Sequence, residues 1–408
     1  MTLTVISNCR LFEPRAGQYL DAHHLLIEDG TVREVSDRPI RANAARRIDA
    51  SGHSVLPGFI DAHFHAYGAD FNIQKLDSMP ASLLSQYARR ALEEALQRGF
   101  TTVRDAAGAD IGLKIAIDRG LIEGPRLYFS GRAISQTGGH GDPRAADHVP
   151  LCGCGYNGVL SQVADGPDAV RHAAREELRR GATQLKLFLS GGVISPTDPI
   201  WMPQMSADEI RAAVEEAATR RTYVMAHAHT ADAARRCISS GVRSIEHATI
   251  LDAATARAVA ESSAYVVPTL IVLQALCEES GSLGLSPAMQ AKAQEVNRHA
   301  LQSLDYLRAA GARIGFGTDL LGRIMDRQSR EFVLRREVMG AADVLRSATV
   351  INAELLNEAG RLGELKPGAH ADLVIVEGDP LADISVLADP ARMLLVMRGG
   401  NVFRDRLL

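Results

Sequence analysis

Histidines at the ends of short apolar segments are the residues of this sequence best placed to do chemistry. His63 and His65 form a His-x-His pair, His227 and His229 form a second, and His247 ends a further apolar run. Alternation along a strand would place His63 and His65 on the same face. Imidazole is a common ligand of zinc and related divalent metals. One such pair is often structural, so the inference depends on what the other segments contribute.

A lysine and an aspartate extend this set. Lys186 lies inside the apolar run 184–189, where an ammonium group is costly unless it is neutralised or paired, and a buried ion pair is the structural explanation. Asp319 ends the glycine-containing run 315–319. If these segments are strands of one sheet, five strand ends bring His, His, Lys, His, His and Asp to one face. Thirteen histidines placed at random would rarely do this, so we interpret the set as a metal-dependent catalytic centre.

The middle of the chain alternates between short apolar runs and helical patterns, which predicts parallel β/α units. Eight runs have the character of strands: 55–61, 101–105, 126–130, 184–189, 223–226, 244–246, 265–267 and 313–317. Helical patterns lie between them, among others at 83–98, 169–180, 207–220 and 288–309. Eight units over about 260 residues have the size of a (β/α)8 TIM barrel, whose function lies at the C-terminal ends of its strands. A doubly wound sheet is the alternative, but no GxGxxG motif follows the first strand.

The two ends of the chain differ from this middle. Residues 1–56 have the pattern of strands and turns, and residues 362–408 repeat it around a Lys-Pro-Gly turn at 366–368. We therefore predict an α/β fold, with a barrel over 57–361 and a small discontinuous β-sandwich domain formed by 1–56 and 362–408.

Composition limits the class of protein further. The 408 residues include 49 acidic and 45 basic side chains, and this near-neutral balance offers no basic surface for nucleic acid. No run approaches the roughly 18 apolar residues of a membrane span, and the N-terminus lacks a signal-peptide pattern. Five cysteines argue against a disulfide framework. We interpret the close pair Cys152 and Cys154 as free thiols, with a metal or redox role as the alternative, and expect a cytoplasmic protein.

The chemical constellation resembles the amidohydrolase superfamily over essentially the whole chain. The matching residues are His63, His65, Lys186, His227, His247 and Asp319. The runs GFIDAHFH at 58–65 and GAHADLV at 368–374 add to the likeness. The lysine resembles that of the binuclear subtype, in which carbon dioxide converts the amine to a carbamate that bridges two divalent ions. The resemblance implies one ion on His63, His65 and Asp319 and another on His227 and His247, with zinc as the default and cobalt, manganese or iron as alternatives.

More locally, the chain is similar to the imidazolonepropionase-related branch that holds prolidase-like dipeptidases, carboxypeptidases and ochratoxin-type N-acyl amino acid hydrolases. The runs that carry this likeness are GFTTVRD at 99–105, SQTGGHGD at 135–142, SGGV at 190–193 and FGTDL at 316–320. The likeness implies that metal-activated hydroxide attacks the amide bond of an Xaa-Pro-like dipeptide or an N-acyl amino acid and releases the C-terminal amino acid. Asp319 would take the water proton and pass it to the leaving amine.

Several further residues are candidates for substrate contact. By resemblance His140 reaches the site and binds the substrate, although a loop histidine can also cap local backbone. Arg144 and His148 follow in the same loop and would either meet a carboxylate or lie at the surface. His229 departs from the branch, which usually has a tyrosine there that contacts the substrate, so this position affects substrate preference. Trp201 would either line the pocket or pack against the protein.

Three acidic residues at strand ends, Asp61, Asp105 and Glu246, either orient the histidines or cap strands.

Other activities stay open. A hydrolase of a cyclic amide or another small-molecule amide or ester would use the same chemistry. A non-catalytic scaffold would lack ligands that are present here, and a deaminase usually needs one metal and no lysine. The expected partners are a small-molecule or dipeptide substrate and further copies of the chain, with no nucleic acid and no membrane.

Overall fold

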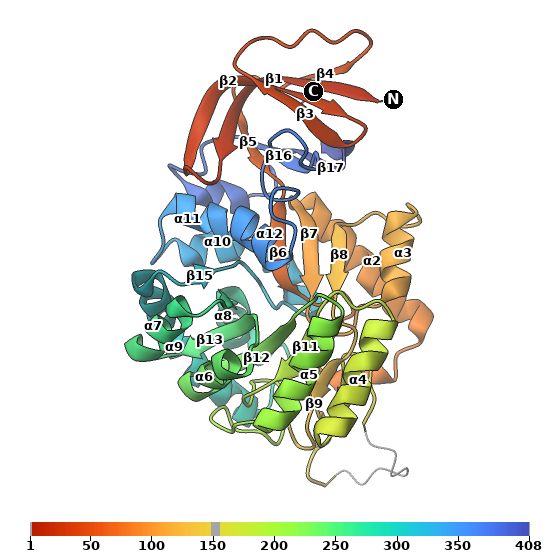
Figure 1. The fold of residues 1–408 in the computed structure, drawn as a ribbon, viewed down its shortest axis with the longest axis vertical. Coiled ribbons are helices and arrows are strands. Elements are labelled where there is room, and N and C mark those ends of the chain that lie inside the picture. Colours follow the sequence, from red (N-terminus) through yellow and green to blue (C-terminus); the bar gives the residue numbers. More distant parts are fainter. Residues whose placement is uncertain (1, 148–155, 408) are drawn as a thin grey trace.

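A computed structural model describes residues 2–147 and 156–407 of the chain. A sheet built from both ends of the chain lies at one end of the molecule, and alternating strands and helices form the rest (Figure 1). The hypotheses on Cys152, Cys154 and His148 lie outside the described residues. No helix in the described part is both long enough and apolar enough to cross a membrane.

The terminal sheet combines strands from both ends of the chain. Within the described residues its strands are β1 (Leu3–Glu13), β2 (Gln18–Glu28), β3 (Thr31–Ser36), β4 (Arg46–Asp49), β5 (Ser54–Pro57), β16 (Leu373–Val376), β17 (Met393–Arg398) and β18 (Asn401–Asp405). They follow the order β18-β17-β16-β5-β1-β2-β3, and β4 also pairs with β1. They form one continuous hydrogen-bonded sheet, because β5 pairs with β1 from one end of the chain and with β16 from the other. Side chains from both ends share one buried cluster.

The remaining strands form two parallel sheets, as the alternating pattern predicted. Their bounds are β6 (Phe59–Phe64), β7 (Phe100–Asp105), β8 (Arg126–Phe129), β9 (Ala133–Ser135), β10 (Ser161–Val163), β11 (Leu185–Phe188), β12 (Val224–Thr230), β13 (Ser244–Ile250), β14 (Tyr265–Val267) and β15 (Arg313–Ile314). One sheet has the order β6-β7-β8 and the other β10-β9-β11-β12-β13-β14-β15. The α/β class is therefore confirmed.

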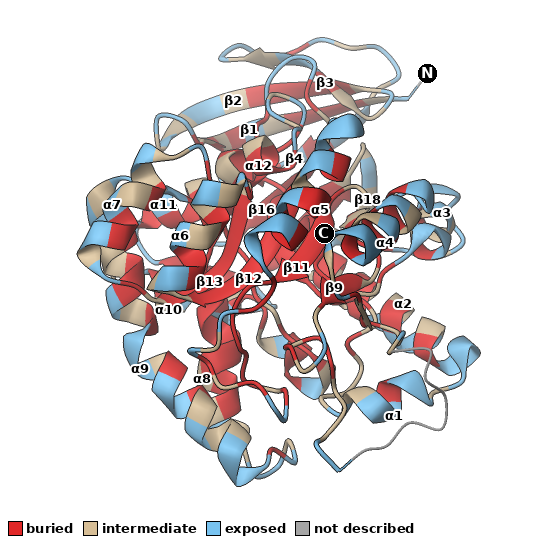
Figure 2. Cartoon of the chain, turned by 60° about the horizontal axis from the view of Figure 1, so that its bottom comes forward, coloured by how far each residue is buried: buried red, intermediate tan, exposed pale blue. Residues whose placement is uncertain are grey.

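Backbone hydrogen bonds connect these two sheets on both sides. The amide of Ala62 in β6 donates to the carbonyl of Phe316, just after β15, at 2.8 Å. On the other side, the amide of Thr183, just before β11, donates to the carbonyl of Phe129 in β8, also at 2.8 Å. The buried strands lie in the middle of the molecule, and helices with exposed outer faces surround them (Figure 2).

The strand bounds differ from the predicted ones where tertiary contacts decide them. The predicted strand 55–61 is divided at Gly58 between β5 and β6. A Cβ on Gly58 would lie 2.1 Å from Thr101 Oγ1 in β7, so any larger residue there would force Thr101 to move. The segment 126–130 corresponds to β8, which the separate short strand β9 follows, and the segment 313–317 is a regular strand only over its first two residues, although Gly315 and Phe316 still make backbone hydrogen bonds to the neighbouring strands.

Helices follow most of the parallel strands. The α-helices are α1 (Ile73–Asp77), α2 (Ala81–Gln97), α3 (Ile111–Asp118), α4 (Pro167–Arg179), α5 (Ala207–Thr219), α6 (Ala231–Ser240), α7 (Ala253–Glu261), α8 (Leu270–Glu279), α9 (Pro287–Ala310), α10 (Arg330–Arg335), α11 (Ala341–Arg346) and α12 (Asn352–Leu355). Short irregular helices are η1 (Gly322–Arg327), η2 (Ser347–Ile351) and η3 (Ile384–Ala388). Several α-helices begin at residues that cap a helix N-terminus, such as the Ser206–Glu209 capping box of α5. These helices cover the strands and leave the strand ends to form the site.

Candidate active site

A cavity at the C-terminal ends of the parallel strands collects the residues that the sequence singled out. Its lining includes His63, His65, His140, Lys186, His227, His229, His247 and Asp319. They come from β6 and the residue after it, from β11, β12 and β13, from the loop after β9 and from the segment after β15. The cavity therefore unites residues that are far apart in the sequence.

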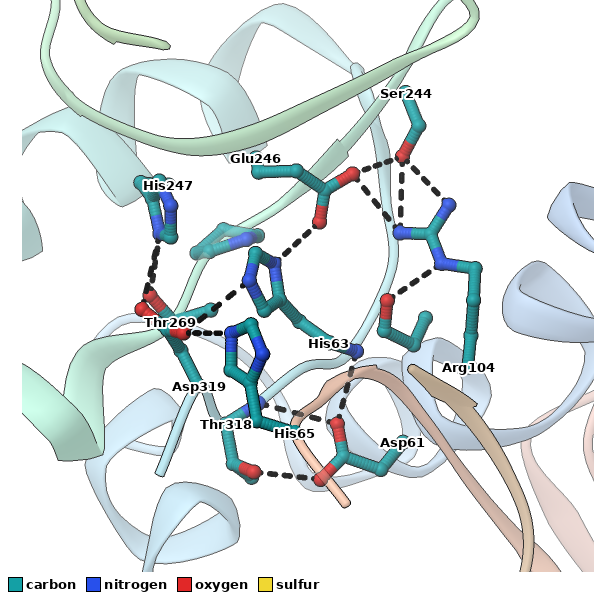
Figure 3. Close-up of polar contacts among 12 residues, drawn as sticks. Asp61, His63, His65, Arg104, Ser244, Glu246, His247, Thr269, Thr318 and Asp319 are labelled. Carbon is teal, nitrogen blue, oxygen red and sulfur yellow. Dashed lines mark hydrogen bonds and ion pairs between the residues drawn. The ribbon is translucent and has the colours of Figure 1, made fainter. Parts of the chain in front are cut away.

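His63 and His65, at the end of β6, and Asp319 form a compact group of potential metal ligands. One ligand atom from each of His63, His65 and Asp319 lies within 4.8 Å of the others (Figure 3). Asp319 Oδ1 is 2.9 Å from His65 Nε2 and 3.2 Å from His63 Nε2. Two imidazoles and a carboxylate are a donor set suited to a divalent ion.

A second group lies beside the first. The ring centroids of His227 and His247 are 4.6 Å apart, and those of His63 and His247 are 4.9 Å apart. Strand register explains the grouping, because Phe188 pairs with His227 between β11 and β12, and Ala228 pairs with His247 between β12 and β13. Lys186, two residues before Phe188, lines the same cavity.

The backbone is strained at two members of the set. His247 has a φ of +71° and Asp319 a φ of +57°, in the left-handed region that non-glycine residues seldom adopt. Such conformations persist only where surrounding contacts impose them, and they concentrate at functional sites.

Polar partners hold the outer sides of the imidazole rings. His63 Nδ1 donates to Glu246 Oε2 at 2.7 Å, and Glu246 in turn accepts from Arg104 at 2.9 Å (Figure 3). His247 Nδ1 pairs with Thr269 Oγ1 at 2.8 Å. Such partners fix ring orientation and leave the opposite nitrogen for a metal. Of the two alternatives for Glu246, this contact favours the one in which it orients a histidine.

Asp61 and Asp105 hold backbone rather than imidazole rings. Asp61 is fully buried and accepts from the amide of His63 at 3.0 Å and from the hydroxyl of Thr318 at 2.6 Å. It thereby ties the end of β6 to the residue before Asp319. Asp105, the last residue of β7, accepts hydrogen bonds from the amides of Ala66 and Ala109.

Burial sets the protonation states of the site. It lowers the pKa of Lys186 to about 8, that of His140 to about 4 and that of His229 to about 3. Burial also lowers the pKa of His227 and His247. Neutral imidazole is the form that binds metal, and a lysine that loses its proton readily is a nucleophile.

Asp319 stays ionised in this setting. Burial alone would raise its pKa, but the charge of His63 and the hydrogen bonds from His63 and His65 hold the pKa well below its usual range. The donor set therefore fits the divalent ions that the sequence implied: imidazoles, of which His227 and His247 are held neutral, an ionised carboxylate and a readily deprotonated lysine.

The candidate substrate-contacting residues separate into two groups. His140 and His229 line the cavity, with His140 Nδ1 at 2.7 Å from Ser195 Oγ and His229 Nδ1 at 2.7 Å from Thr249 Oγ1. The structure does not bring Arg144 into the cavity, because its guanidinium pairs with the neighbouring carboxylate of Asp142 at 2.7 Å. Trp201 neither lines the cavity nor is buried, since 73% of its surface is exposed.

Sequence reasoning missed the apolar wall of the cavity. The wall contains Phe71, Ile73, Leu160, Phe188, Val193, Ile194, Val272, Leu273, Leu276 and Leu321. Alternation along β11 could have identified Phe188, which shares a face with Lys186. The others come from loops and helices that carry no local signal for a pocket.

Known proteins with similar sequences and structures agree with the chemistry of this cavity. The model of the amidohydrolase family matches residues 54–403. Ochratoxinase of Aspergillus niger is 33% identical over 412 residues, which cover 97% of this chain and 85% of that protein. A crystal structure of a prolidase complexed with N-methylphosphonate-L-proline has 44% identity and a TM-score of 0.96 over 99% of this chain and 100% of that one. A Xaa-Pro dipeptidase with bound methionine in its active site has 29% identity and a TM-score of 0.89 over 99% and 100% of the two chains. The matched family model and the convergent histidine, lysine and aspartate side chains agree, and the chain belongs to the amidohydrolase family.

Proposed function

We propose that this protein is a metal-dependent hydrolase that cleaves the amide bond of a dipeptide or an N-acyl amino acid and releases the C-terminal amino acid. The observation that carries the proposal is the convergence of His63, His65 and Asp319 with His227, His247 and Lys186 in one buried cavity. Family membership supports hydrolysis of an amide, and the relatives include a prolidase and an ochratoxinase.

The proposal includes a fold in which the two parallel sheets close into a (β/α)8 barrel over residues 57–361. The hydrogen bonds from Ala62 to Phe316 and from Thr183 to Phe129 at the two seams support closure. Residues 1–56 and 362–408 form the accessory domain, in agreement with the terminal sheet.

The ligands divide into two sets. His63, His65 and Asp319 would hold one divalent ion, His227 and His247 a second, and a carbamate formed on Lys186 would complete both sites. Such ions, with zinc as the default, supply Lewis-acid chemistry that lowers the pKa of a water molecule and polarises the scissile carbonyl. The lowered pKa of Lys186 supports carbamate formation, because only the unprotonated amine attacks carbon dioxide.

Asp319 is the proposed acid–base residue. It lines the cavity and is held in place by His63 and His65, so its carboxylate is positioned to take a proton from water and return it to the leaving amine. His140 and His229 lie on the same cavity and would donate hydrogen bonds to the substrate carbonyl or carboxylate. The apolar wall would receive the acyl part of the substrate.

The test is release of free amino acid from a panel that holds Xaa-Pro dipeptides, N-acyl amino acids and ochratoxin A. The protein is assayed with its metals, beside an Asp319→Asn control purified in the same way. Release by the wild type alone is the expected result. Cyclic amides and other small-molecule amides are assayed separately. Turnover of these compounds, with no release from the panel, would assign a different substrate class. Inactivity on the panel and on these compounds would overturn the proposal.

A further inference from the structure

A lysine from a distant helix holds the loop that follows β11 over the cavity. Lys292 lies near the start of α9, and its ammonium donates to the carbonyl oxygens of Gly192 and Ser195 at 2.9 Å and of Asp198 at 2.6 Å. Only 15% of its side chain is exposed. Three carbonyl oxygens that face one another repel unless a cation lies between them, and an ammonium group offers three donors. Lys292 thus stabilises the curvature of the loop 191–198.

The buried carboxylate of Asp198 also depends on the ammonium group of Lys292. Asp198 is fully buried, and its Oδ2 accepts from the Gly192 amide at 2.9 Å and from Gln204 Nε2 at 3.1 Å. Its Oδ1 has no hydrogen-bond partner among the described residues, and Lys292 Nζ lies 3.8 Å away. A buried carboxylate without a nearby cation is strongly destabilising, so Lys292 compensates the charge as well as the carbonyl dipoles.

The loop in turn sets the place of the His140 ring. Ser195 Oγ lies 2.7 Å from His140 Nδ1, and the amide of His140 donates to Gln204 at 2.9 Å. A side chain on Gly192 would lie 2.2 Å from His140 Cε1, so the imidazole rests directly against the loop backbone. Gly192 and Ser195, which touch the ring, are both residues whose carbonyls Lys292 holds.

We propose that Lys292 is a positioning residue for substrate binding. It fixes the loop 191–198 so that Ser195 engages Nδ1 of His140 and leaves Nε2 for the substrate. The inference rests on the proposed function through the substrate-binding role of His140. Lys292 itself does not line the cavity.

The kinetic test compares Lys292→Met with Lys114→Met in the holoenzyme. Lys114 is a control of the same type, because it lies partly exposed on α3 and pairs with Asp118. We expect Lys292→Met to raise KM about tenfold or more, as loss of a charged hydrogen bond does, with a smaller fall in kcat and unchanged metal content. Lys292→Arg keeps the charge without three convergent donors and should give an intermediate KM. An unchanged KM in Lys292→Met, or a loss of bound metal, would overturn the inference.

Two further measurements separate positioning from general destabilisation. Hydrogen–deuterium exchange of the peptide spanning 190–200 should speed up in Lys292→Met and Lys292→Arg and stay unchanged in Lys114→Met. In a double-mutant cycle, the KM effect of Lys292→Met should shrink when Ser195 is already alanine, because both changes act on His140. Exchange needs no substrate, so unchanged exchange overturns the inference even if the panel identifies no substrate. A wild type with no turnover counts against the proposed function instead.

Discussion

Replacing Glu246 by glutamine removes one charge from a buried network while keeping its shape. Glu246 is fully buried and accepts from Arg104 at 2.9 Å and from His63 Nδ1 at 2.7 Å. Arg104 is itself fully buried. The substitution therefore leaves a buried guanidinium without its counter-charge and exchanges the charged acceptor of His63 for an amide.

The structure gives the size of the effect. The pKa of Glu246 lies at about 2 instead of 4.5: burial alone would raise it, but the charge of Arg104 and the hydrogen bond from His63 outweigh burial. That difference corresponds to about 3 kcal/mol in favour of the charged form. Breaking a buried ion pair costs about 3–5 kcal/mol, so we expect Glu246→Gln to lower the free energy of unfolding by that amount at pH 7. Loss of the partner of His63 should weaken metal binding about 10- to 100-fold.

Urea unfolding of the metal-free protein and metal titration measure the two effects. A carboxyl group whose pKa is lower in the folded state stabilises the protein above its unfolded pKa, and the gain is lost as pH falls. The stability difference between wild type and Glu246→Gln should thus shrink from about pH 4.5 down to about pH 2. Glu176→Gln is the control and should change little, because Glu176 is a partly exposed surface carboxylate that also binds two arginines. Equal unfolding midpoints and equal metal affinity for wild type and Glu246→Gln would refute the reasoning.

Three further substitutions test other parts of the site. Asp319→Asn should lower kcat at least about 100-fold in initial-rate assays, and full turnover with intact metal content would exclude its role in proton transfer. Arg335→Met should lower the free energy of unfolding by about 3–5 kcal/mol in urea, because it breaks the fully buried ion pair with Glu331 and frees the carbonyls of Gly315 and Pro268; a midpoint equal to that of the wild type would contradict this. Arg144→Ala should leave KM unchanged, because its guanidinium is occupied by Asp142 outside the cavity, and a large rise in KM would show that the arginine reaches the substrate.

The sequence sufficed where chemistry follows strand periodicity. Alternation along the first predicted strand indicated that His63 and His65 share a face, and the rule that parallel strands end at one edge predicted that Lys186, His227, His247 and Asp319 join them. For Glu246, its place at a strand end left both an orienting role and a capping role open, and its contact with His63, which comes from the other parallel sheet, required the structure.

Contacts between distant segments were beyond the reach of periodicity. Lys292 carries no signal in the helical pattern 288–309, since its importance comes from three carbonyls a hundred residues earlier. The single terminal sheet depends on β5 pairing with strands from both ends of the chain. Arg144 looked suited to a substrate carboxylate, but the local pair with Asp142 depends on loop conformation.

The central claim is a binuclear metal centre that depends on Lys186. Its most direct test is the metal content per chain, measured by elemental mass spectrometry on wild type and Lys186→Met purified separately in the same way. Lys186 is buried and lines the same cavity as the two histidine groups, so methionine should fit there while abolishing the carbamate. The binuclear account predicts close to two metals per wild-type chain and one or fewer in the variant. About one metal or none in the wild type, or equal metal content in both proteins, would contradict it.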